Sequence, residues 1–252
     1  MKSKTKHVKY QSLYGIHPVK EALIAQKRIV HQIFINENSR NARLDEIVSM
    51  ASERNIKVTN VAPSDLSKIV KHEDHQHIVA HVSELPLIDY HDMVTSHAFI
   101  IICDQIMDPH NMGAIIRTAL ASGATGIITP KDHCTPLSAT VSKISSGAME
   151  HLNIARVTNL VRCIKALKTA GIWVFGLEGH AQISVYDISF IDRVALVIGG
   201  EHKGIRRLVR ENCDQTVHIP QIGPLDSLNA SVAAGIAMYE VFRQRQNFPE
   251  PL

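Results

Sequence analysis

Three groups of polar residues, each placed after an apolar run, supply the side chains that a chemical site would need. The first group is Asn111, Gly113 and Arg117, which follows the apolar run 98–103. Asn111 can cap the helix that begins beside it, and Gly113 allows a close approach of the backbone. Arg117 falls on the first two turns of the same helix. Taken alone, this group also fits a capped helix with a solvated arginine.

The second group surrounds Glu201, in the stretch Gly199-Gly200-Glu201-His202-Lys203-Gly204 directly after the apolar run 194–198. Glycines at the end of a strand permit a tight turn or the approach of a ligand. Glu201 would then point outward from the carboxyl edge of a sheet. The alternative is an acidic residue in the first turn of a helix over 204–211, favoured by the helix dipole.

The third group is the loop Leu225–Ser231, which follows Ile219-Pro220 and precedes a helical pattern over 231–245. Ser227 and Asn229 offer a hydroxyl and an amide, and Asn229 or Ser231 also suits the N-cap of that helix. Ligands of open α/β sheets bind at the carboxyl ends of the strands, so the three groups together predict one common site. The candidate site residues are Asn111, Arg117, Glu201, Ser227 and Asn229.

A larger domain over residues 98–252 would position these groups. Its expected strands are near-continuous apolar runs at 98–103, 126–128, 172–175, 194–198 and 217–219. Its expected helices are 112–122, 138–147, 158–169, 204–211 and 231–245. Strands that are apolar on both faces and alternate with helices indicate a parallel sheet in an α/β domain.

A smaller αβαβαβ domain is expected over residues 11–83, after a basic tail at 1–10. Its predicted strands are 31–35, 56–58 and 78–82. Pro18 suits the first turn of its first helix, and Ser64 suits the N-cap of a short later helix. Residues 84–97, with a proline and no clear periodicity, are expected to form the linker between the two domains.

The charge of the chain is uneven. Residues 1–85 hold 13 lysines and arginines against 9 aspartates and glutamates, a balance of +4, whereas residues 86–252 hold 14 against 15, a balance of −1. A basic accessory segment suggests a polyanionic partner such as RNA or DNA, although a solvated surface with a basic tail gives the same count.

Composition excludes several classes of protein. No apolar run approaches the roughly 18 residues of a membrane span, and no apolar segment follows the basic N-terminus, so we expect a cytoplasmic protein without membrane contact. The four cysteines contain no Cys-x-x-Cys pair, which argues against a zinc site or a disulfide framework. The histidines of segment 72–81 could be read as metal ligands, but an RNA-facing or solvated edge is favoured, and no metal is predicted. The glycine fingerprints of dinucleotide and nucleoside-triphosphate binding are absent.

The ordered motifs carry a resemblance. The stretches Asn111-x-Gly113-x-x-x-Arg117-Thr118, Gly199-Gly200-Glu201-x-x-Gly204 and Ser227-Leu228-Asn229-x-Ser231 resemble the three motifs of the SpoU (TrmH-type) RNA ribose 2'-O-methyltransferases, over residues 98–245. The N-terminal domain, with its stretch 14–19, is similar to the ribosomal-protein-like RNA-binding domain of one branch. That branch methylates a guanosine of 23S ribosomal RNA.

The resemblance implies a fold, a cofactor and partners. It implies a deep trefoil knot in the C-terminal domain, S-adenosylmethionine as cofactor, and a homodimer formed through the C-terminal domain with 23S rRNA, free or in an assembly precursor, as substrate. By position, Gly199, Ile219 and Leu228 would bind the cofactor. Asn111, Arg117, Glu201, Ser227 and Asn229 would form the catalytic set.

The expected mechanism gives Arg117 a clamping role. A guanidinium is effectively always protonated, so we expect Arg117 to hold a phosphate next to the acceptor ribose and to stabilise the developing alkoxide. Glu201 would orient Arg117 or Ser227, and Asn111 would fix the ribose. Two alternatives remain: the same chemistry on tRNA or another rRNA nucleotide, and a non-catalytic RNA-binding or ribosome-assembly protein.

Overall fold

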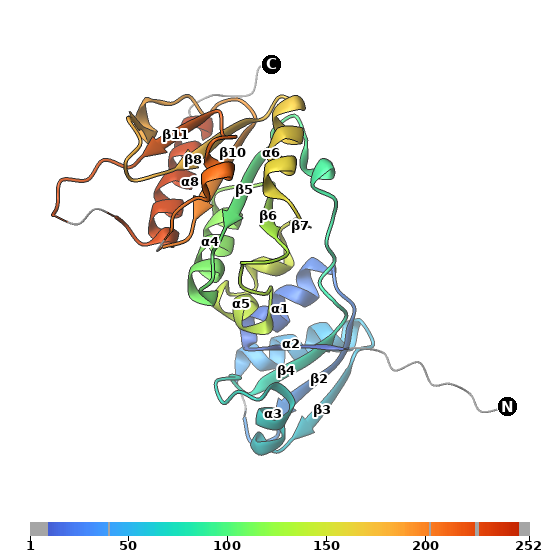
Figure 1. The fold of residues 1–252 in the computed structure, drawn as a ribbon. Coiled ribbons are helices and arrows are strands. Elements are labelled where there is room, and N and C mark those ends of the chain that lie inside the picture. Colours follow the sequence, from blue (N-terminus) through green and yellow to red (C-terminus); the bar gives the residue numbers. More distant parts are fainter. Residues whose placement is uncertain (1–9, 40, 202, 225–226, 247–252) are drawn as a thin grey trace. The chain divides into compact units, whose positions relative to one another are not determined.

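The chain forms two compact units (Figure 1). The computed structural model describes residues 10–39, 41–201, 203–224 and 227–246, so most of the predicted basic tail lies outside the described residues. The first unit comprises Met1–Pro86 together with Leu137–His151, and the second comprises Leu87–Pro136 and Leu152–Leu252. Residues 137–151, which the sequence analysis assigned to the larger domain, thus group with the first unit.

The first unit is built on a mixed four-stranded sheet with the order β1-β4-β2-β3. Its strands are β1 (Gln11–Tyr14), β2 (Val30–Asn36), β3 (Lys57–Val61) and β4 (Ile78–Val82). β4 runs antiparallel to β1 and β2, whereas β2 and β3 are parallel. The first element among the described residues is β1, which the predicted αβαβαβ order lacked, because four residues are too few to show a strand alternation.

Helices cover both faces of this sheet. The helices are α1 (Ile16–Ala25), α2 (Ala42–Glu53) and α3 (Pro63–Val70). Leu23 of α1 and Ile47 of α2 pack with Ile33 in the main core, and Leu66 of α3 packs with Tyr14 and Val79 in a smaller one. Ala62, not the predicted Ser64, is the N-cap of α3, because Pro63 takes the first helical position.

The segment 137–151 completes the first unit. It contains α5 (Ala139–Ile144) and the 3-10 turn η2 (Ala148–Glu150). Glu150 Oε2 lies 2.8 Å from Nε of Arg28, and both side chains are 1% exposed. The alignment of these two atoms is that of an ion pair rather than of a hydrogen bond. The other carboxylate oxygen of Glu150 accepts a hydrogen bond from Ser142 at 3.0 Å.

The second unit is built on a seven-stranded parallel sheet with the order β7-β6-β5-β10-β8-β11-β9. Its strands are β5 (Phe99–Asp104), β6 (Gly126–Pro130), β7 (Ile154–Val157), β8 (Trp173–Leu177), β9 (Ile183–Ser184), β10 (Val194–Gly199) and β11 (Gln215–His218). Almost every residue of the two central strands, β5 and β10, is buried, as expected for strands that are covered on both faces of the sheet. The predicted parallel α/β domain is therefore confirmed, while β7 and β9 were not predicted.

Helices lie on both faces of the parallel sheet, as Figure 1 shows. They are α4 (Pro109–Ala121), α6 (Leu160–Thr169), α7 (Arg207–Arg210) and α8 (Ala230–Gln246), with the 3-10 turns η1 (Tyr90–Met93) and η3 (Val185–Asp187). Cys163 and Leu167 of α6 pack with Ile102 and Val197 of the sheet in one core cluster. Helices α4 and α8 pack against each other. Among the described residues, no helix is long and apolar enough to cross a membrane.

Strand order decides which loops meet. β10 lies directly beside β5, and Gly199 pairs with Asp104 at the carboxyl ends of the two strands. The loop that carries Asn111 and the loop that carries Glu201 therefore start side by side, although 90 residues separate them in sequence. The trefoil knot stays a prediction.

Candidate active site

The turn after β5 places Asn111 inside a helix rather than at its cap. The side chain of Asp108 accepts a hydrogen bond from the backbone N–H of His110 at 2.8 Å, and Pro109 takes the first helical position of α4. The prediction that Asn111 caps this helix is therefore wrong. Asn111 lies in the first turn with a buried side chain, and it is available for contacts beyond its own helix.

A buried carboxylate joins the two central loops. Asp104, the last residue of β5, is 0% exposed and accepts hydrogen bonds from the backbone N–H of Arg206 at 2.9 Å and from its Nε at 2.8 Å. A charge at that depth must be paired, so this contact fixes the loop after β10 against the end of β5.

Two glycines allow the loops to approach each other. A Cβ on Gly199 would lie 2.3 Å from the carbonyl carbon of Gly204, and a Cβ on Gly200 would lie 2.3 Å from the carbonyl oxygen of Gln105. No other residue fits at either position. Helix α7 begins only at Arg207, so the alternative of Glu201 as a first-turn acid of a helix over 204–211 is wrong.

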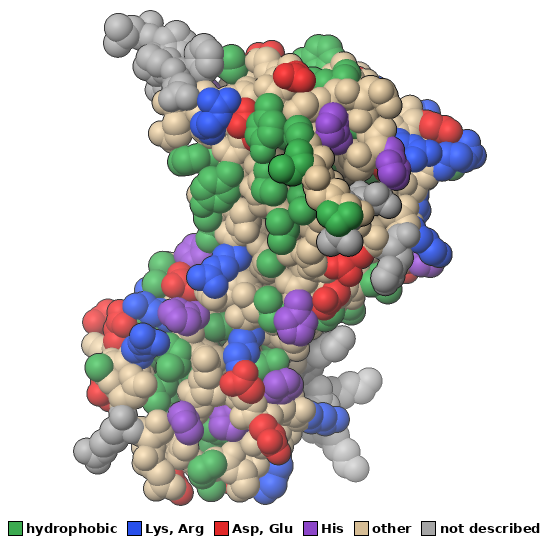
Figure 2. Space-filling view, turned by 90° about the vertical axis from the view of Figure 1, so that its left-hand side faces the viewer, with side chains coloured by type: hydrophobic (Ala, Val, Ile, Leu, Met, Phe, Trp, Pro, Cys, Tyr) green, Lys and Arg blue, Asp and Glu red, His purple; other side chains and the backbone are tan. Residues whose placement is uncertain are grey.

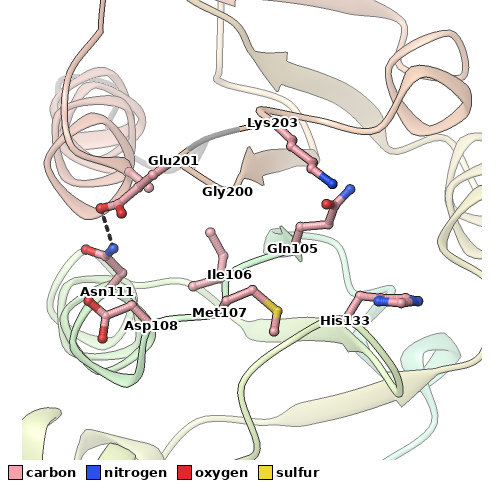
Figure 3. Close-up of a pocket in the computed structure, with 10 residues that line it drawn as sticks. Gln105, Ile106, Met107, Asp108, Asn111, His133, Gly200, Glu201 and Lys203 are labelled. Atoms are coloured by element: carbon pink, nitrogen blue, oxygen red, sulfur yellow. Dashed lines mark hydrogen bonds between the residues drawn. The ribbon is translucent and has the colours of Figure 1, made fainter.

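Asn111, Glu201 and Asn229 form a closed hydrogen-bonded cluster. Glu201 Oε1 accepts from Asn111 Nδ2 at 2.6 Å and from Asn229 Nδ2 at 2.7 Å. Asn229 Nδ2 also donates to Asn111 Oδ1 at 3.0 Å. Figure 3 shows Glu201 and Asn111 facing each other across one side of a pocket. The structure thus brings together one residue from each of the three predicted groups.

Asn229 has two roles at once. Its Oδ1 accepts from the backbone N–H of Ser231 at 2.9 Å and of Val232 at 3.2 Å, which makes it the cap of α8. Its Nδ2 reaches Glu201 and Asn111. The cap therefore fixes the rotamer of Asn229 and the direction in which its amide donates.

Arg117 and Ser227 stay outside this cluster. Arg117 is exposed on α4, and Ser227 is exposed in the loop before α8. Among the described residues, neither side chain makes a hydrogen bond or an ion pair. Arg117 follows Asn111 by six residues on α4, which corresponds to a rotation of about 240° and a rise of about 9 Å along the helix. The two side chains therefore point in different directions. The expected contact of Glu201 with Arg117 or Ser227 is not present in the part of the chain that the structure describes.

A cleft opens at the carboxyl ends of β8, β10 and β11. It is lined by the three predicted cofactor-binding residues, Gly199, Ile219 and Leu228, and by Ser227 and Glu201. Further apolar lining comes from Leu177, Ile198 and Ala230, and a second carboxylate from Glu178. Apolar walls suit a flat purine, and carboxylates suit the positive sulfonium and amino groups, so this lining fits S-adenosylmethionine.

A second pocket adjoins the cleft and shares Gly200, Glu201 and Ala230 with it. It is lined by Gln105, Ile106, Met107, His133 and Lys203 and by the predicted Asn111 (Figure 3). The sequence analysis missed the first five of these residues. Met107 and Lys203 lie within a few residues of the recognised motifs, and this proximity in sequence was the only indication that they could line the site.

The described histidines and cysteines outside this site give no sign of a second reactive centre. His77 Nδ1 lies 2.9 Å from Asn36 Nδ2, and His75 Nε2 lies 3.3 Å from the Ser67 hydroxyl, so both histidines hold the first unit together. In the described part of the chain, no group of three metal-binding side chains converges. Burial raises the pKa of Cys134 to about 11 and of Cys163 to about 12, which leaves little thiolate at neutral pH.

Comparison with known proteins agrees with this geometry. The model of the SpoU rRNA Methylase family matches residues 98–239, and that of RNA 2'-O ribose methyltransferase substrate binding matches residues 12–87. The 23S rRNA (guanosine-2'-O-)-methyltransferase RlmB of Xylella fastidiosa (strain 9a5c) is 37% identical over 243 residues, which are 94% of this chain and 98% of that protein.

Solved structures show the same fold. The SpoU methyltransferase AviRb of Streptomyces viridochromogenes, in complex with AdoMet, is 27% identical with a TM-score of 0.81 over 98% of this chain and 95% of that one. The TrmH/SpoU tRNA modifying enzyme of A. aeolicus is 26% identical with a TM-score of 0.55 over 62% of this chain and 80% of that one. The resemblance read from the motifs is confirmed: the chain belongs to the SpoU rRNA methylase family.

Proposed function

We propose that this protein transfers the methyl group of S-adenosylmethionine to the ribose 2'-hydroxyl of a guanosine in 23S ribosomal RNA. The observation that carries the proposal is the Asn111–Glu201–Asn229 cluster, which stands where the cofactor cleft and the adjoining pocket meet. The RlmB proteins that are 36–37% identical over more than nine tenths of the chain support this RNA and this nucleoside. We place the reaction in the cytoplasm, on free 23S rRNA or on an assembly precursor.

Gly199, Ile219 and Leu228 would hold the cofactor in the cleft at the ends of β8, β10 and β11. S-adenosylmethionine supplies a methyl group that is already activated on a sulfonium sulfur. The chain itself must align the acceptor oxygen with that methyl group and accept one proton. Alignment of two reactants alone contributes up to about 7–11 kcal/mol in favourable systems.

Glu201 would receive the acceptor hydroxyl. Its Oε1 is shared by two amide donors, whereas Oε2 has no partner among the described residues. The ribose 2'-hydroxyl would donate to Oε2, and its proton would pass to this carboxylate or to water as the C–O bond forms and the C–S bond breaks. Asn111 and Asn229 would act as positioning residues for Glu201. This role replaces the predicted orientation of Arg117 by Glu201.

Arg117 would bind RNA rather than move the proton, because a guanidinium stays protonated. It is exposed, and no side chain in the described ranges binds it. A bidentate contact with a phosphate next to the acceptor ribose suits such a group. If the variant Arg117→Lys kept near-full activity, the bidentate role would be excluded.

The exposed face of α4 and α8 would form a homodimer. Leu120 lies one turn after Arg117 on α4, and Val232 and Tyr239 on α8 are each 49% exposed. Figure 2 shows hydrophobic side chains gathered on one face of the second unit. We expect Val232→Asp combined with Tyr239→Asp to convert a dimer into a monomer in sedimentation experiments. A wild-type protein that sediments as a monomer at every concentration would refute the dimer.

The decisive experiment is methyl transfer in vitro. The purified protein is incubated with a 23S rRNA transcript and S-adenosylmethionine, and the oligonucleotides from a ribonuclease digest are analysed by mass spectrometry. We expect 2'-O-methylguanosine at a single position. A base-methylated product, or binding of RNA without cofactor binding in a calorimetric titration, would reject the proposal.

A tRNA substrate is the second candidate, since one structural relative is named as a tRNA modifying enzyme. That relative matches only 62% of this chain, whereas the RlmB proteins match both units. Parallel reactions with total tRNA separate the two candidates, and faster methylation of tRNA than of 23S rRNA would favour the second.

A further inference from the structure

The pocket beside the cofactor cleft has a polar wall opposite the reaction centre. In Figure 3, Asn111 and Glu201 stand on one side, while Gln105 and Lys203 point toward each other on the other side. Ile106 and Met107 lie between them, and Met107 is 63% exposed whereas Ile106, at 1%, lies beneath the surface. The pocket therefore offers an apolar surface with hydrogen-bond donors at its far end.

The pocket is held in shape by its own backbone. The Ile106 carbonyl oxygen accepts from the backbone N–H of Thr135 at 2.8 Å, which ties the turn after β5 to the loop after β6. The Gln105 carbonyl oxygen lies against Gly200, and Gln105 itself has a left-handed φ of 61°. Three strand-end loops are thus joined, and the walls do not need to assemble when RNA arrives.

The pocket lies next to the proposed reaction centre, which limits what part of the RNA can enter it. The reacting 2'-oxygen must lie at the boundary with the cofactor cleft, near Glu201, and the base is attached to the carbon next to the one that carries this oxygen. The base of the same nucleotide therefore falls within one sugar width of Glu201. The pocket that contains Asn111, Gly200 and Glu201 in its wall is where a nucleobase can lie.

The polar wall distinguishes among bases. Lys203 carries only hydrogen-bond donors, and the Gln105 amide carries two more. Guanine presents two acceptors, O6 and N7, on one edge, whereas adenine presents a donor and an acceptor there, and pyrimidines lack N7. An ammonium group at this place favours guanine over the other bases.

We propose that this pocket binds the guanine of the nucleotide that is methylated, with Met107 against its face and Lys203 and Gln105 at its O6 and N7 edge. This inference rests on the proposed function, and it makes Lys203 the residue that determines base specificity.

The test compares acceptor nucleotides in one RNA. A ligated 23S rRNA fragment carries guanosine, inosine or 2-aminopurine riboside at the methylated position, and kcat/KM is measured for each. Inosine keeps O6 and N7, whereas 2-aminopurine lacks O6. We expect the wild-type protein to use inosine almost as well as guanosine and to lose roughly tenfold or more with 2-aminopurine.

Lys203→Met should abolish that preference by lowering kcat/KM for guanosine to the value for 2-aminopurine, and Lys203→Arg should restore it. Lys131→Met removes another exposed lysine that does not line the pocket, and it should leave the ratio between the two acceptors unchanged. Cofactor affinity, measured by calorimetry, should be the same in all variants.

An unchanged ratio in Lys203→Met would overturn the inference while the proposed function stands. Failure of the wild-type protein to methylate the guanosine fragment would instead count against the proposed function, so the two failures are distinguishable.

Discussion

Glu201 is held by two amide groups, and its second carboxylate oxygen has no partner among the described residues. Asn111 and Asn229 both donate to Oε1, at 2.6 and 2.7 Å. Because Asn229 is fixed by the helix that it caps, the carboxylate is fixed in turn. Preorganisation of this kind removes the cost of ordering the acceptor group when the substrate binds.

We predict that Glu201→Gln lowers the single-turnover rate of methyl transfer by roughly 100-fold or more, since general base or acceptor groups contribute factors of this size. The glutamine oxygen can still accept from both amides, but the second position becomes a donor and cannot receive the hydroxyl. The affinity for S-adenosylmethionine should change little in a calorimetric titration.

The matched control is Glu211→Gln, at an exposed glutamate that pairs with Arg207. It should retain wild-type activity. A Glu201→Gln protein that transfers methyl groups within a factor of a few of the wild-type rate would show that this carboxylate does not accept the hydroxyl.

Sequence reasoning could name Asn111, Glu201 and Asn229 but not their contacts. Each follows a predicted strand, so a shared edge of the sheet was a sound expectation. Which of them touch depends on β10 lying beside β5, and strand order is not visible in a hydrophobic pattern. Gln105 and His133 were missed because no local pattern reports a left-handed backbone at a residue other than glycine.

At the scale of elements, the site depends on how closely two loops approach. Gly199 and Gly200 let the end of β10 lie against the turn after β5, where Asp104 binds Arg206. The cleft at the ends of β8, β10 and β11 and the pocket that adjoins it share this boundary. A small displacement of the backbone at Gly199 and Gly200 should therefore change the shape of both cavities.

We predict that Gly200→Ala impairs cofactor binding and activity together. The new Cβ would lie 2.3 Å from the Gln105 carbonyl oxygen, a backbone atom that cannot rotate away. Thermal unfolding and cofactor titration measure the two effects. Gly223→Ala is the control, because a Cβ there meets nothing within 4 Å. Equal behaviour of the two variants would show that the close approach is not required.

Helix α8 is attached to the loop between η3 and β10 through Glu240 and Gln244. This buried glutamate accepts from Gln244 at 2.7 Å, and Gln244 in turn binds the backbone of Ile188 and Phe190. Hydrogen bonds from Arg243 lower the pKa of Glu240. A lowered pKa in the folded state stabilises the fold above the unfolded-state pKa, and that stability is lost as the pH falls through the folded-state value.

We predict that Glu240→Gln is less stable than the wild type by about 1.5–3 kcal/mol at pH 7, the usual range for hydrogen bonds to a charged group. The difference should shrink as the pH falls through the lowered pKa of Glu240. Melting temperatures measured from neutral to acidic pH check this. A difference that does not depend on pH would point to packing instead of charge.

Long elements were predicted well and short ones poorly. The runs that became β5 and β10 are apolar at nearly every position, so their type was clear. β7 has only four residues, with the exposed Arg156 in its middle, and it shows no continuous apolar run. Helix α7 is four residues long because the preceding loop is held by Asp104 and cannot adopt helical geometry.

At the scale of the whole molecule, the first unit is discontinuous in sequence. Its core is closed by residues 137–151, which carry Glu150 into contact with Arg28. Burial raises the pKa of Glu150, and the neighbouring guanidinium opposes that rise. The pair is nearly inaccessible to water, so removing one partner leaves an uncompensated buried charge.

We predict that Arg28→Met destabilises the first unit by about 3–5 kcal/mol, and that adding Glu150→Gln recovers most of the loss. Hydrogen exchange of the peptide that covers residues 139–150 locates the effect. Lys20→Met, which breaks a more exposed pair with Glu46, should cost less than about 1 kcal/mol. Equal exchange in Arg28→Met and the double variant would contradict the role of an unpaired carboxylate.

The discontinuity of the first unit sets the order in which the protein can mature during synthesis. When residue 86 leaves the ribosome, all four strands of the first sheet have been made, but α5 and η2 have not. β5, α4 and β6 of the second unit are translated before the first unit receives its last segment. The Arg28–Glu150 ion pair of the first unit can therefore form only after part of the second unit has been made, and a graft of residues 1–86 onto another enzyme would leave Arg28 without Glu150.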